Sequence, residues 1–186
     1  AASDVYKRQT MTALSILNML PLNVTQTSGS ILYNNKPFNE NICGTFISMI
    51  MQAPASCFDS VFTIGTQFKD ILISNHKEYS INRVYTMLEK VELHNPQDIL
   101  NSYPFQLSGG MLQRVMIAIA LSLDSKVIIA DEPTSDLDVA GQKEIIDLIL
   151  KLKKENKSVL MITHNLAVAK SCADKIAVME HGRLVD

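Results

Sequence analysis

The sequence predicts an α/β fold in which a mostly parallel sheet is interrupted by an inserted helical segment. Along most of the chain, short apolar runs alternate with longer amphipathic stretches, as strands and helices do when they follow one another. Between residues 58 and 123, the apolar residues recur mainly at helical spacing. Because helical crossovers join parallel strands, we expect ligands to gather at the carboxyl ends of the strands.

Composition limits the class of partner. With 186 residues, 47% of them hydrophobic and 19% charged, the chain is long enough for one globular domain. Its net charge of −2 gives no electrostatic reason to expect nucleic acid. Its cysteines, Cys43, Cys57 and Cys172, show no zinc spacing, which favours reduced thiols in a cytosolic protein. No run approaches the roughly 18 apolar residues of a membrane span, so a membrane role would need another subunit.

The elements before the insert are one helix and two strands. We expect the helix in residues 10–20, TMTALSILNML, and the strands in residues 30–35 and 46–52. Turn residues Asn34 and Asn35 close the first strand.

Helices fill the insert, and strands return after it. Within the insert, residues 61–72, 81–93 and 111–123 have helical spacing, and Pro96 and Pro104 separate these stretches. The later elements are strands in residues 126–131, 158–164 and 175–179, helices in residues 141–155 and 165–173, and a last hairpin through His181 and Gly182.

Two acids stand where a buried strand ends. The run VIIADE places Asp131 and Glu132 after the small or branched apolar residues 127–130. On such a strand Asp131 can orient magnesium, and Glu132 can project towards an attacking water. The plain alternative is a strand that runs into a polar loop.

A second candidate site opens a helix. In LSGGMLQR (107–114), Ser108, Gly109 and Gly110 precede a mostly buried helix. Glycines let the backbone approach an anion closely, and free amides at a helix start favour negative charge. The alternative is a serine N-cap followed by a flexible helix start.

The order and spacing of four elements resemble the nucleotide-binding domain of ABC-type ATPases. These elements are Gln52 at a strand end, LSGGMLQR, IIADEPTSDLD (128–138) and ITH (162–164). The resemblance implies a P-loop NTPase-like sheet with an inserted helical subdomain. It assigns the helical subdomain to about residues 58–123 and the RecA-like core to residues 10–57 and 124–186.

The resemblance also implies a role for each site residue, with ATP and Mg²⁺ as cofactors. Asp131 would be the magnesium acid, Glu132 the general base and His164 the switch histidine that touches the γ-phosphate. Gln52 would link magnesium and water to the helical insert. The signature loop, with the proposed nucleotide contacts Leu107, Ser108, Gly109, Gly110 and Gln113, would reach the γ-phosphate held by a second copy. Ser135 to Asp138 would form the D-loop across the dimer interface, with Asp138 counted among the nucleotide contacts, although Asp136 stands where many members have alanine.

The first nine residues do not fit this family. A phosphate-binding loop reads GxxxxGK[ST], and Thr10 stands where its final hydroxyl belongs, as a further magnesium ligand. The pattern then requires Gly, Gly and Lys at positions that hold Ser3, Arg8 and Gln9. We therefore expect residues 1–9 to be a non-native leader and the sequence to be cut within the phosphate loop. The last hairpin is also expected to be cut.

Within the family, the chain is most similar to ATPase subunits of importers for oligopeptides, dipeptides and nickel or related chelates. The runs YPFQLSGGMLQRVMIAIAL and ILNMLPLNVTQTSGSILYNNKPF carry this similarity, whereas residues 55–60 depart from the usual Leu-Asn-Pro turn. The resemblance implies two membrane-spanning permease subunits, a second ATPase subunit arranged head to tail and an external substrate-binding protein. It places the ATPase at the cytoplasmic face of the membrane.

Two other functions stay open. One is an ABC-type ATPase without a transporter, acting on chromosomes or ribosomes. Only 55 residues separate Gln52 from Leu107, too few for a long coiled coil, and a charged linker is absent from the sequence. The other is a non-catalytic regulatory module, because the phosphate loop does not match. Glu132 and His164 argue against that second function.

Overall fold

The computed structural model describes residues 2–37, 44–135, 137–155 and 157–185. The helices are α1 (Ala2–Ile16), α2 (Ile64–Ser74), α3 (Ile81–Lys90), α4 (Pro96–Asn101), α5 (Gly109–Ser122), α6 (Val139–Lys154) and α7 (Leu166–Cys172), with 3-10 turns η1 (Pro54–Ser56) and η2 (Pro104–Gln106). The strands are β1 (Leu32–Tyr33), β2 (Lys36–Pro37), β3 (Ile47–Ile50), β4 (Val127–Asp131), β5 (Ser158–Ile162), β6 (Met179–Glu180) and β7 (Arg183–Leu184).

The central sheet is parallel, as the alternation of strands and helices predicts. Its strand order is β3-β4-β5, with Ile50 opposite Ala130 and Asp131 opposite Ile162. Helices α2 to α5 form the crossover from β3 to β4, and α6 forms the crossover from β4 to β5. All three strands therefore end at the same edge of the sheet.

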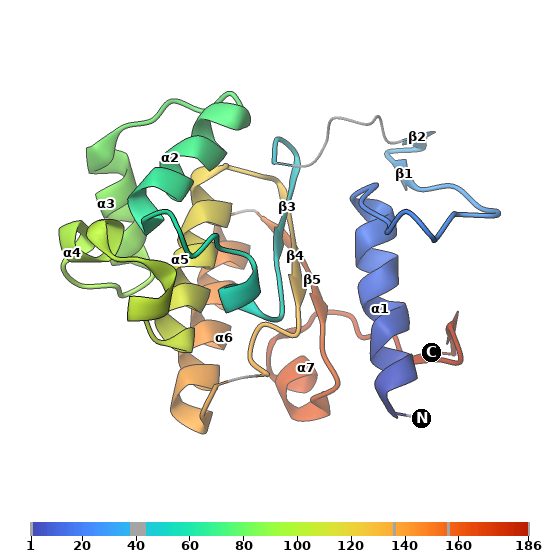
Figure 1. Cartoon of the computed structure of the whole chain (residues 1–186). Helices are drawn as coiled ribbons and strands as arrows, with labels where there is room; N and C mark the ends of the chain where they lie inside the picture. Colours follow the sequence, from blue (N-terminus) through green and yellow to red (C-terminus); the bar gives the residue numbers. More distant parts are fainter. Residues whose placement is uncertain (1, 38–43, 136, 156, 186) are drawn as a thin grey trace.

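Helices cover both faces of this sheet. Helix α1 lies on one side, and α5 and α6 lie on the other (Figure 1). Side chains of β4 alternate between these faces, as the period of two in a strand requires. Ile129 shares a cluster with Ala13 of α1 and with Leu17 directly after it, whereas Ile128 and Ala130 belong to the larger core beneath α5 and α6. The site-bearing strand is therefore held from both sides.

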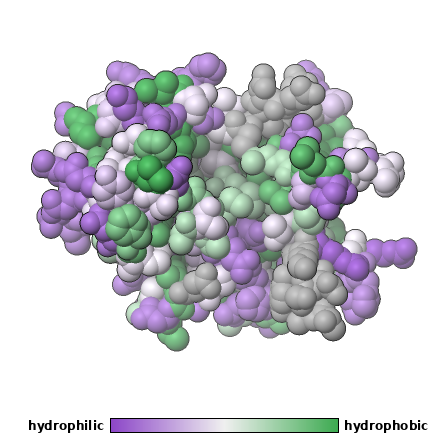
Figure 2. Space-filling model, viewed as in Figure 1, coloured by the Kyte–Doolittle hydropathy of each residue, from purple (hydrophilic) through white to green (hydrophobic). Residues whose placement is uncertain are grey.

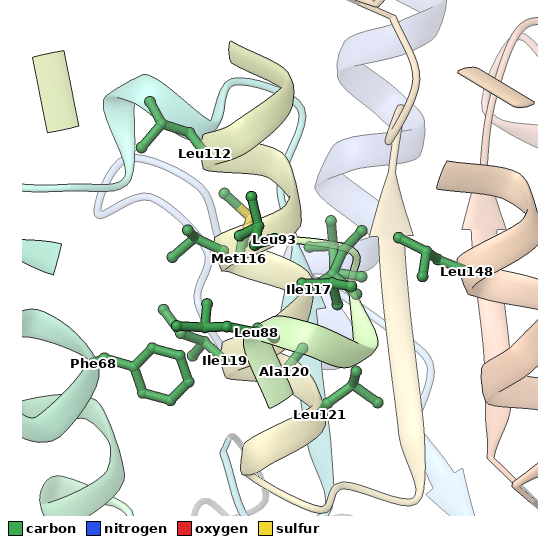
Figure 3. Close-up of a cluster of buried hydrophobic side chains, with 14 of the residues drawn as sticks. Phe68, Leu88, Leu93, Leu112, Met116, Ile117, Ile119, Ala120, Leu121 and Leu148 are labelled. Carbon is green, nitrogen blue, oxygen red and sulfur yellow. The ribbon is translucent and has the colours of Figure 1, made fainter. Parts of the chain in front are cut away.

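The inserted segment is helical, as expected. Phe68, Leu88 and Met116 come from α2, α3 and α5, and their side chains meet in one buried cluster (Figure 3). Leu148 of α6 belongs to the same cluster, so the insert and the crossover helix share one core. Helix α5 is apolar around most of its circumference because it lies between the sheet and the other helices.

The predicted elements differ from the structure at the two ends of the chain. The helix expected at 10–20 begins at Ala2 and ends at Ile16, so residues 2–9 belong to the same helix as Thr10. The strand expected at 30–35 shortens to β1, because Asn34 and Asn35 adopt left-handed backbone angles and reverse the chain into β2.

At the C-terminal end, the strand expected at 175–179 is wrong except for Met179. Ile176 and Val178 are each 45% exposed, so this apolar run lacks a covering partner among the described residues. The hairpin through His181 and Gly182 forms as predicted. Both ends of the chain lie on the same side of the molecule, where β6 contacts α1 (Figure 1).

The visible face in Figure 2 mixes hydrophilic and apolar side chains over the helical insert. Cys57 is exposed and Cys172 is half-buried, and both are free thiols, whereas Cys43 lies outside the described residues. No helix in the described ranges is both long and apolar enough to cross a bilayer.

Candidate active site

The side chains of Thr10 and Asp131 meet at the carboxyl end of β4. Thr10 lies one turn before Ala13 and two turns before Leu17, so it shares the face of α1 that packs on the sheet. Its Oγ1 donates a hydrogen bond of 2.8 Å to Asp131 Oδ2. The two residues are 121 positions apart in the sequence, so the tertiary fold alone brings them together.

Glu132 turns the chain out of β4 in a left-handed conformation. Its φ is +47°, which side-chain-bearing residues adopt only where surrounding contacts hold them. Its N–H donates to Ile162 O at 2.9 Å, and its carbonyl accepts from Ser135 N at 3.2 Å and Ser135 Oγ at 3.1 Å. These bonds aim a buried carboxylate along the strand edge.

His164 binds that carboxylate twice. Its backbone N–H donates to Glu132 Oε1 at 2.8 Å, and its Nδ1 lies 2.6 Å from the same oxygen. The Glu132 side chain is 7% exposed and that of His164 is 55% exposed. Asn165 caps α7 directly after the histidine, accepting from Ala167 N, which fixes where the loop ends. The pair therefore joins a buried acid to an imidazole that reaches solvent.

Asp131 is poised to take a cation. It is 3% exposed, and its Oδ1 has no hydrogen-bond partner among the described residues. Burial raises the pKa of its carboxyl, the hydrogen bond from Thr10 lowers it in part, and the charge of Glu132 raises it further. A buried carboxylate oxygen beside a hydroxyl provides the hard oxygen donors that Mg²⁺ prefers. Magnesium therefore fits this donor set.

Gln52 follows β3, the strand beside β4, and lies level with Glu132 along the sheet. Since Ile50 lies opposite Ala130, Gln52 and Glu132 each stand two residues beyond that pair. Gln52 is exposed, and the next residue begins the turn into η1. The parallel register thus places the glutamine and both acids along one edge.

The signature segment occupies a different part of the chain. Ser108 caps α5, its Oγ accepting from Met111 N at 3.2 Å, so the plain N-cap interpretation holds for its side chain. Ser108 and Gly109 are exposed, whereas Leu107 and Gly110 are half-buried. A Cβ on Gly109 would meet nothing within 4 Å. Among the hydrogen bonds of the described residues, none links this segment to Glu132 or His164.

Two of the residues that the resemblance assigns to nucleotide binding, Gln113 and Asp138, have side chains with different environments: one is buried and the other caps a helix. Gln113 is 3% exposed and its Nε2 has no partner among the described residues, so its side chain faces the interior of the chain. Asp138 is exposed and caps α6, its Oδ1 accepting from Gly141 N at 2.8 Å. Asp136, which departs from the family pattern, lies outside the described residues.

The sequence did not reveal two contacts around the site. A Cβ on Gly110 would lie 3.5 Å from Leu137 Cδ2, so the start of α5 lies close to the segment that precedes α6. Arg114, the last residue of LSGGMLQR, reaches α6 through Glu144. Its position within the quoted motif was the only signal that could have drawn attention to it.

No phosphate cradle forms around residues 2–9. Positions 3, 8 and 9 hold Ser, Arg and Gln, and they lie within α1, so the backbone here is a helix and not a loop. A phosphate loop needs consecutive free amides and a lysine. The described residues therefore fit magnesium but do not supply the contacts that would hold a triphosphate.

Comparisons with known proteins agree with these motifs. The profile of the ABC transporter family matches residues 15–135. The oligopeptide transport ATP-binding protein OppD of Lactococcus lactis subsp. cremoris is 42% identical over 186 residues, covering 94% of this chain and 55% of the relative. The nickel import ATP-binding protein NikD of Pseudomonas putida is 36% identical, covering 96% of this chain and 71% of the relative. The chain thus spans about half the length of the OppD relative.

Solved structures show the same fold. A dimeric ATP-binding cassette in a post-hydrolysis state, bound to ADP and Pi, is 26% identical with a TM-score of 0.72, covering 89% of this chain and 73% of that chain. The cbiO1 protein from Clostridium perfringens, part of an ABC transporter complex, is 24% identical with a TM-score of 0.76, covering 97% and 71%. The fold is therefore the α/β fold of ABC ATPase cassettes. From the family profile and the nickel-importer relative together, the chain belongs to the ABC transporter family.

Proposed function

We propose that this chain is the nucleotide-binding part of an ATPase subunit that powers an importer of peptides or of nickel and related chelates. One observation carries the proposal: Thr10 meets Asp131, and Glu132 meets His164, at one edge of the parallel sheet. That arrangement suits metal-assisted phosphoryl transfer. The transport functions named for the relatives support the choice of substrate class.

Thr10, Asp131 and Gln52 would hold Mg²⁺ at the strand edge. When bound, the ion neutralises charge that develops on the phosphate oxygens. Thr10 Oγ1 donates to one Asp131 oxygen, and the other oxygen, Oδ1, has no hydrogen-bond partner among the described residues and is available to a cation. The hydroxyl thereby also fixes the orientation of the carboxylate.

Glu132 would orient and deprotonate the attacking water. His164 occupies Oε1 through its backbone N–H and Nδ1, and Oε2 accepts no hydrogen bond from the described residues. Oε2 is therefore the atom available to a water. Because His164 is half exposed, it can also reach the γ-phosphate from its solvent side. Catalysis of this kind depends on positioning and charge.

A second copy would complete each site. Leu107, Ser108, Gly109 and Gly110 would face the ATP held by the partner in a head-to-tail dimer, and Asp138 would lie at the same interface. The exposure of Ser108 and Gly109 supports this role, whereas the buried Gln113 would act by supporting the segment from within.

The remaining assignments extend the same proposal. Residues 58–123 would form the helical subdomain, and residues 10–57 and 124–186 the RecA-like core. Closure on ATP would move that subdomain, and the segment after Gln52 would carry the motion to two permease subunits. An external binding protein would deliver the substrate, and the ATPase would lie at the cytoplasmic face of the membrane.

A regulatory module without hydrolysis is the second candidate. The helical backbone of residues 2–9, which lack the loop glycines and lysine, favours it. We therefore expect the chain as written to bind MgATP very weakly, because each lost charge-assisted hydrogen bond is worth about 1.5–3 kcal/mol.

Calorimetry on two forms tests the proposed function. The first is the chain as written. The second, the loop-extended protein, replaces residues 1–9 with a family N-terminal segment that ends in GxxxxGK and joins at Thr10. We expect MgATP binding that is at least about a hundredfold tighter in the loop-extended protein. Equally weak binding by both forms would favour the regulatory module. Micromolar binding by the unmodified chain would show that the nucleotide site does not depend on a loop before Thr10.

A further inference from the structure

Arg114 joins three helices at the base of the signature segment. Its side chain is 12% exposed, although arginine is seldom buried without partners. Nη1 donates to the carbonyl of Val91, which caps α3, at 2.7 Å and lies 3.4 Å from Glu92 Oε2. Nη2 donates to Glu144 of α6. A planar guanidinium can direct two separate nitrogens at these two partners, whereas an ammonium offers only a single nitrogen.

Other ion pairs join the same helices further along. Lys151 of α6 lies 3.1 Å from Glu92, and Lys90 of α3 lies 3.2 Å from Glu155 after α6. These partners are about half exposed, so each pair alone contributes little. Arg114 differs because it is nearly buried and bonds a backbone carbonyl as well as a carboxylate.

The Arg114–Glu144 ion pair lies close to the signature segment along α5 and to the D-loop along α6. Arg114 is one helical turn beyond Gly110, and Gly110 lies next to Leu137 of the D-loop. Asp138, the next residue, caps α6, and Glu144 lies in the second turn of that helix. The start of α5 therefore lies close to Leu137, just before α6, and Arg114 bonds Glu144 about one turn further along both helices.

We propose that Arg114 is a positioning residue that, through Glu144, sets the orientation of the signature turn relative to the D-loop of the same chain. This inference depends on the proposed ATPase function. Arg114 would not touch nucleotide itself. Its bond to Glu144 would keep Ser108 and Gly109 in the orientation that a partner-bound ATP requires, so its loss affects closure of the dimer before it affects chemistry.

The test is ATPase kinetics of the complete importer complex that contains the loop-extended protein, which serves as the parent. Glu144→Gln removes the charge that Arg114 binds but keeps the size of a half-exposed side chain. We expect KM for ATP to rise about threefold to tenfold, with kcat within about twofold of the parent. Glu155→Gln is the matched control, since it removes an ion pair between α3 and the end of α6, away from the signature turn. We expect it to change KM by less than about twofold.

A second pair of variants separates positioning from stability. Arg114→Lys keeps the charge but removes the two-nitrogen fork that joins Val91 O to Glu144, so it should raise KM, and Glu144→Gln added to it should have little further effect. In the isolated chain, Glu144→Gln should also speed amide exchange at Met111 and Leu112. Equal KM values for Glu144→Gln and Glu155→Gln would overturn the inference while leaving the ATPase proposal intact. A parent complex without ATP turnover would instead overturn the proposed function.

Discussion

At the scale of single residues, the site combines two costs that a folded protein normally avoids. Glu132 holds a left-handed backbone, and Asp131 is a buried carboxylate with one unpartnered oxygen. Backbone strain and buried charge concentrate at functional sites. There the surrounding structure holds an unfavourable conformation or charge in place because function requires it. The sequence predicted both acids from the end of an apolar strand. It could not predict the backbone strain, which depends on bonds to Ile162 and Ser135.

Asp131→Asn tests the burial cost through the pH dependence of stability. Because the folded-state pKa of Asp131 is raised, the folded protein resists losing this proton, so stability falls as pH rises from the ordinary aspartate value of about 3.9 through the higher folded value. Asparagine avoids the penalty and can still accept from Thr10. With EDTA present, we expect a melting temperature about 2–4 °C above the parent at pH 7, and a smaller gain below pH 4.

Exposed Asp147 on α6 provides the control, and Asp147→Asn is expected to leave the melting temperature unchanged at both pH values. If Asp131→Asn melts below the parent at neutral pH, the carboxylate is stabilised by groups other than those in the described residues, and the argument from burial fails.

At the scale of elements, apolar runs predicted those strands and helices that have partners in the core. Strands β3, β4 and β5 and helices α2, α3 and α5 all lie where the spacing of apolar residues predicted them. The run at 175–179 has the same composition as a strand, yet only its end is paired: Met179 lies opposite Leu184, and Val178 O accepts from Val185 N, whereas Ile176 is 45% exposed. Helix α1 extends to Ala2 because a helix continues through residues that do not oppose it, whatever loop a family pattern requires there.

Substitutions in the first turn of α5 test the partner-facing role of the signature segment. A side chain at Gly110 meets Leu137 only at ordinary contact distance, so Gly110→Asp is expected to fold. Its carboxylate would stand against the γ-phosphate of the partner's ATP, where like charges repel. In the loop-extended protein, we expect ATP-driven dimerisation, measured by analytical ultracentrifugation, to fall more steeply than nucleotide binding by the monomer.

Gly109→Ala is the milder substitution, because an added methyl group would have no atom of the described residues within 4 Å. We expect unchanged or slightly higher thermal stability, since alanine favours a helix over glycine by about 1 kcal/mol, together with weaker dimerisation. Parallel loss of monomer binding and dimerisation in Gly110→Asp would mean that the segment serves the nucleotide of its own chain.

At the scale of the whole molecule, the site depends on contacts that no local pattern contains. Thr10 reaches Asp131 only because α1 packs on one face of the sheet, and His164 reaches Glu132 because β4 and β5 are parallel neighbours. The order of motifs in a known family, and not residue spacing, predicted these meetings. The motifs did not predict the burial of Gln113 or the contacts of Arg114, because a motif names residues without giving the packing around them.

The central claim is that the edge formed by β3, β4 and β5 hydrolyses ATP through Glu132, and one measurement tests it most directly. ATP turnover and dimerisation are compared in the loop-extended protein for the parent, Glu132→Gln and the control Glu89→Gln, which changes an exposed glutamate of α3. We expect Glu132→Gln to lose about a hundredfold or more of turnover, to retain MgATP binding and to accumulate as an ATP-bound dimer, while the control matches the parent. Turnover by Glu132→Gln within about threefold of the parent would contradict the claim and remove Glu132 from catalysis.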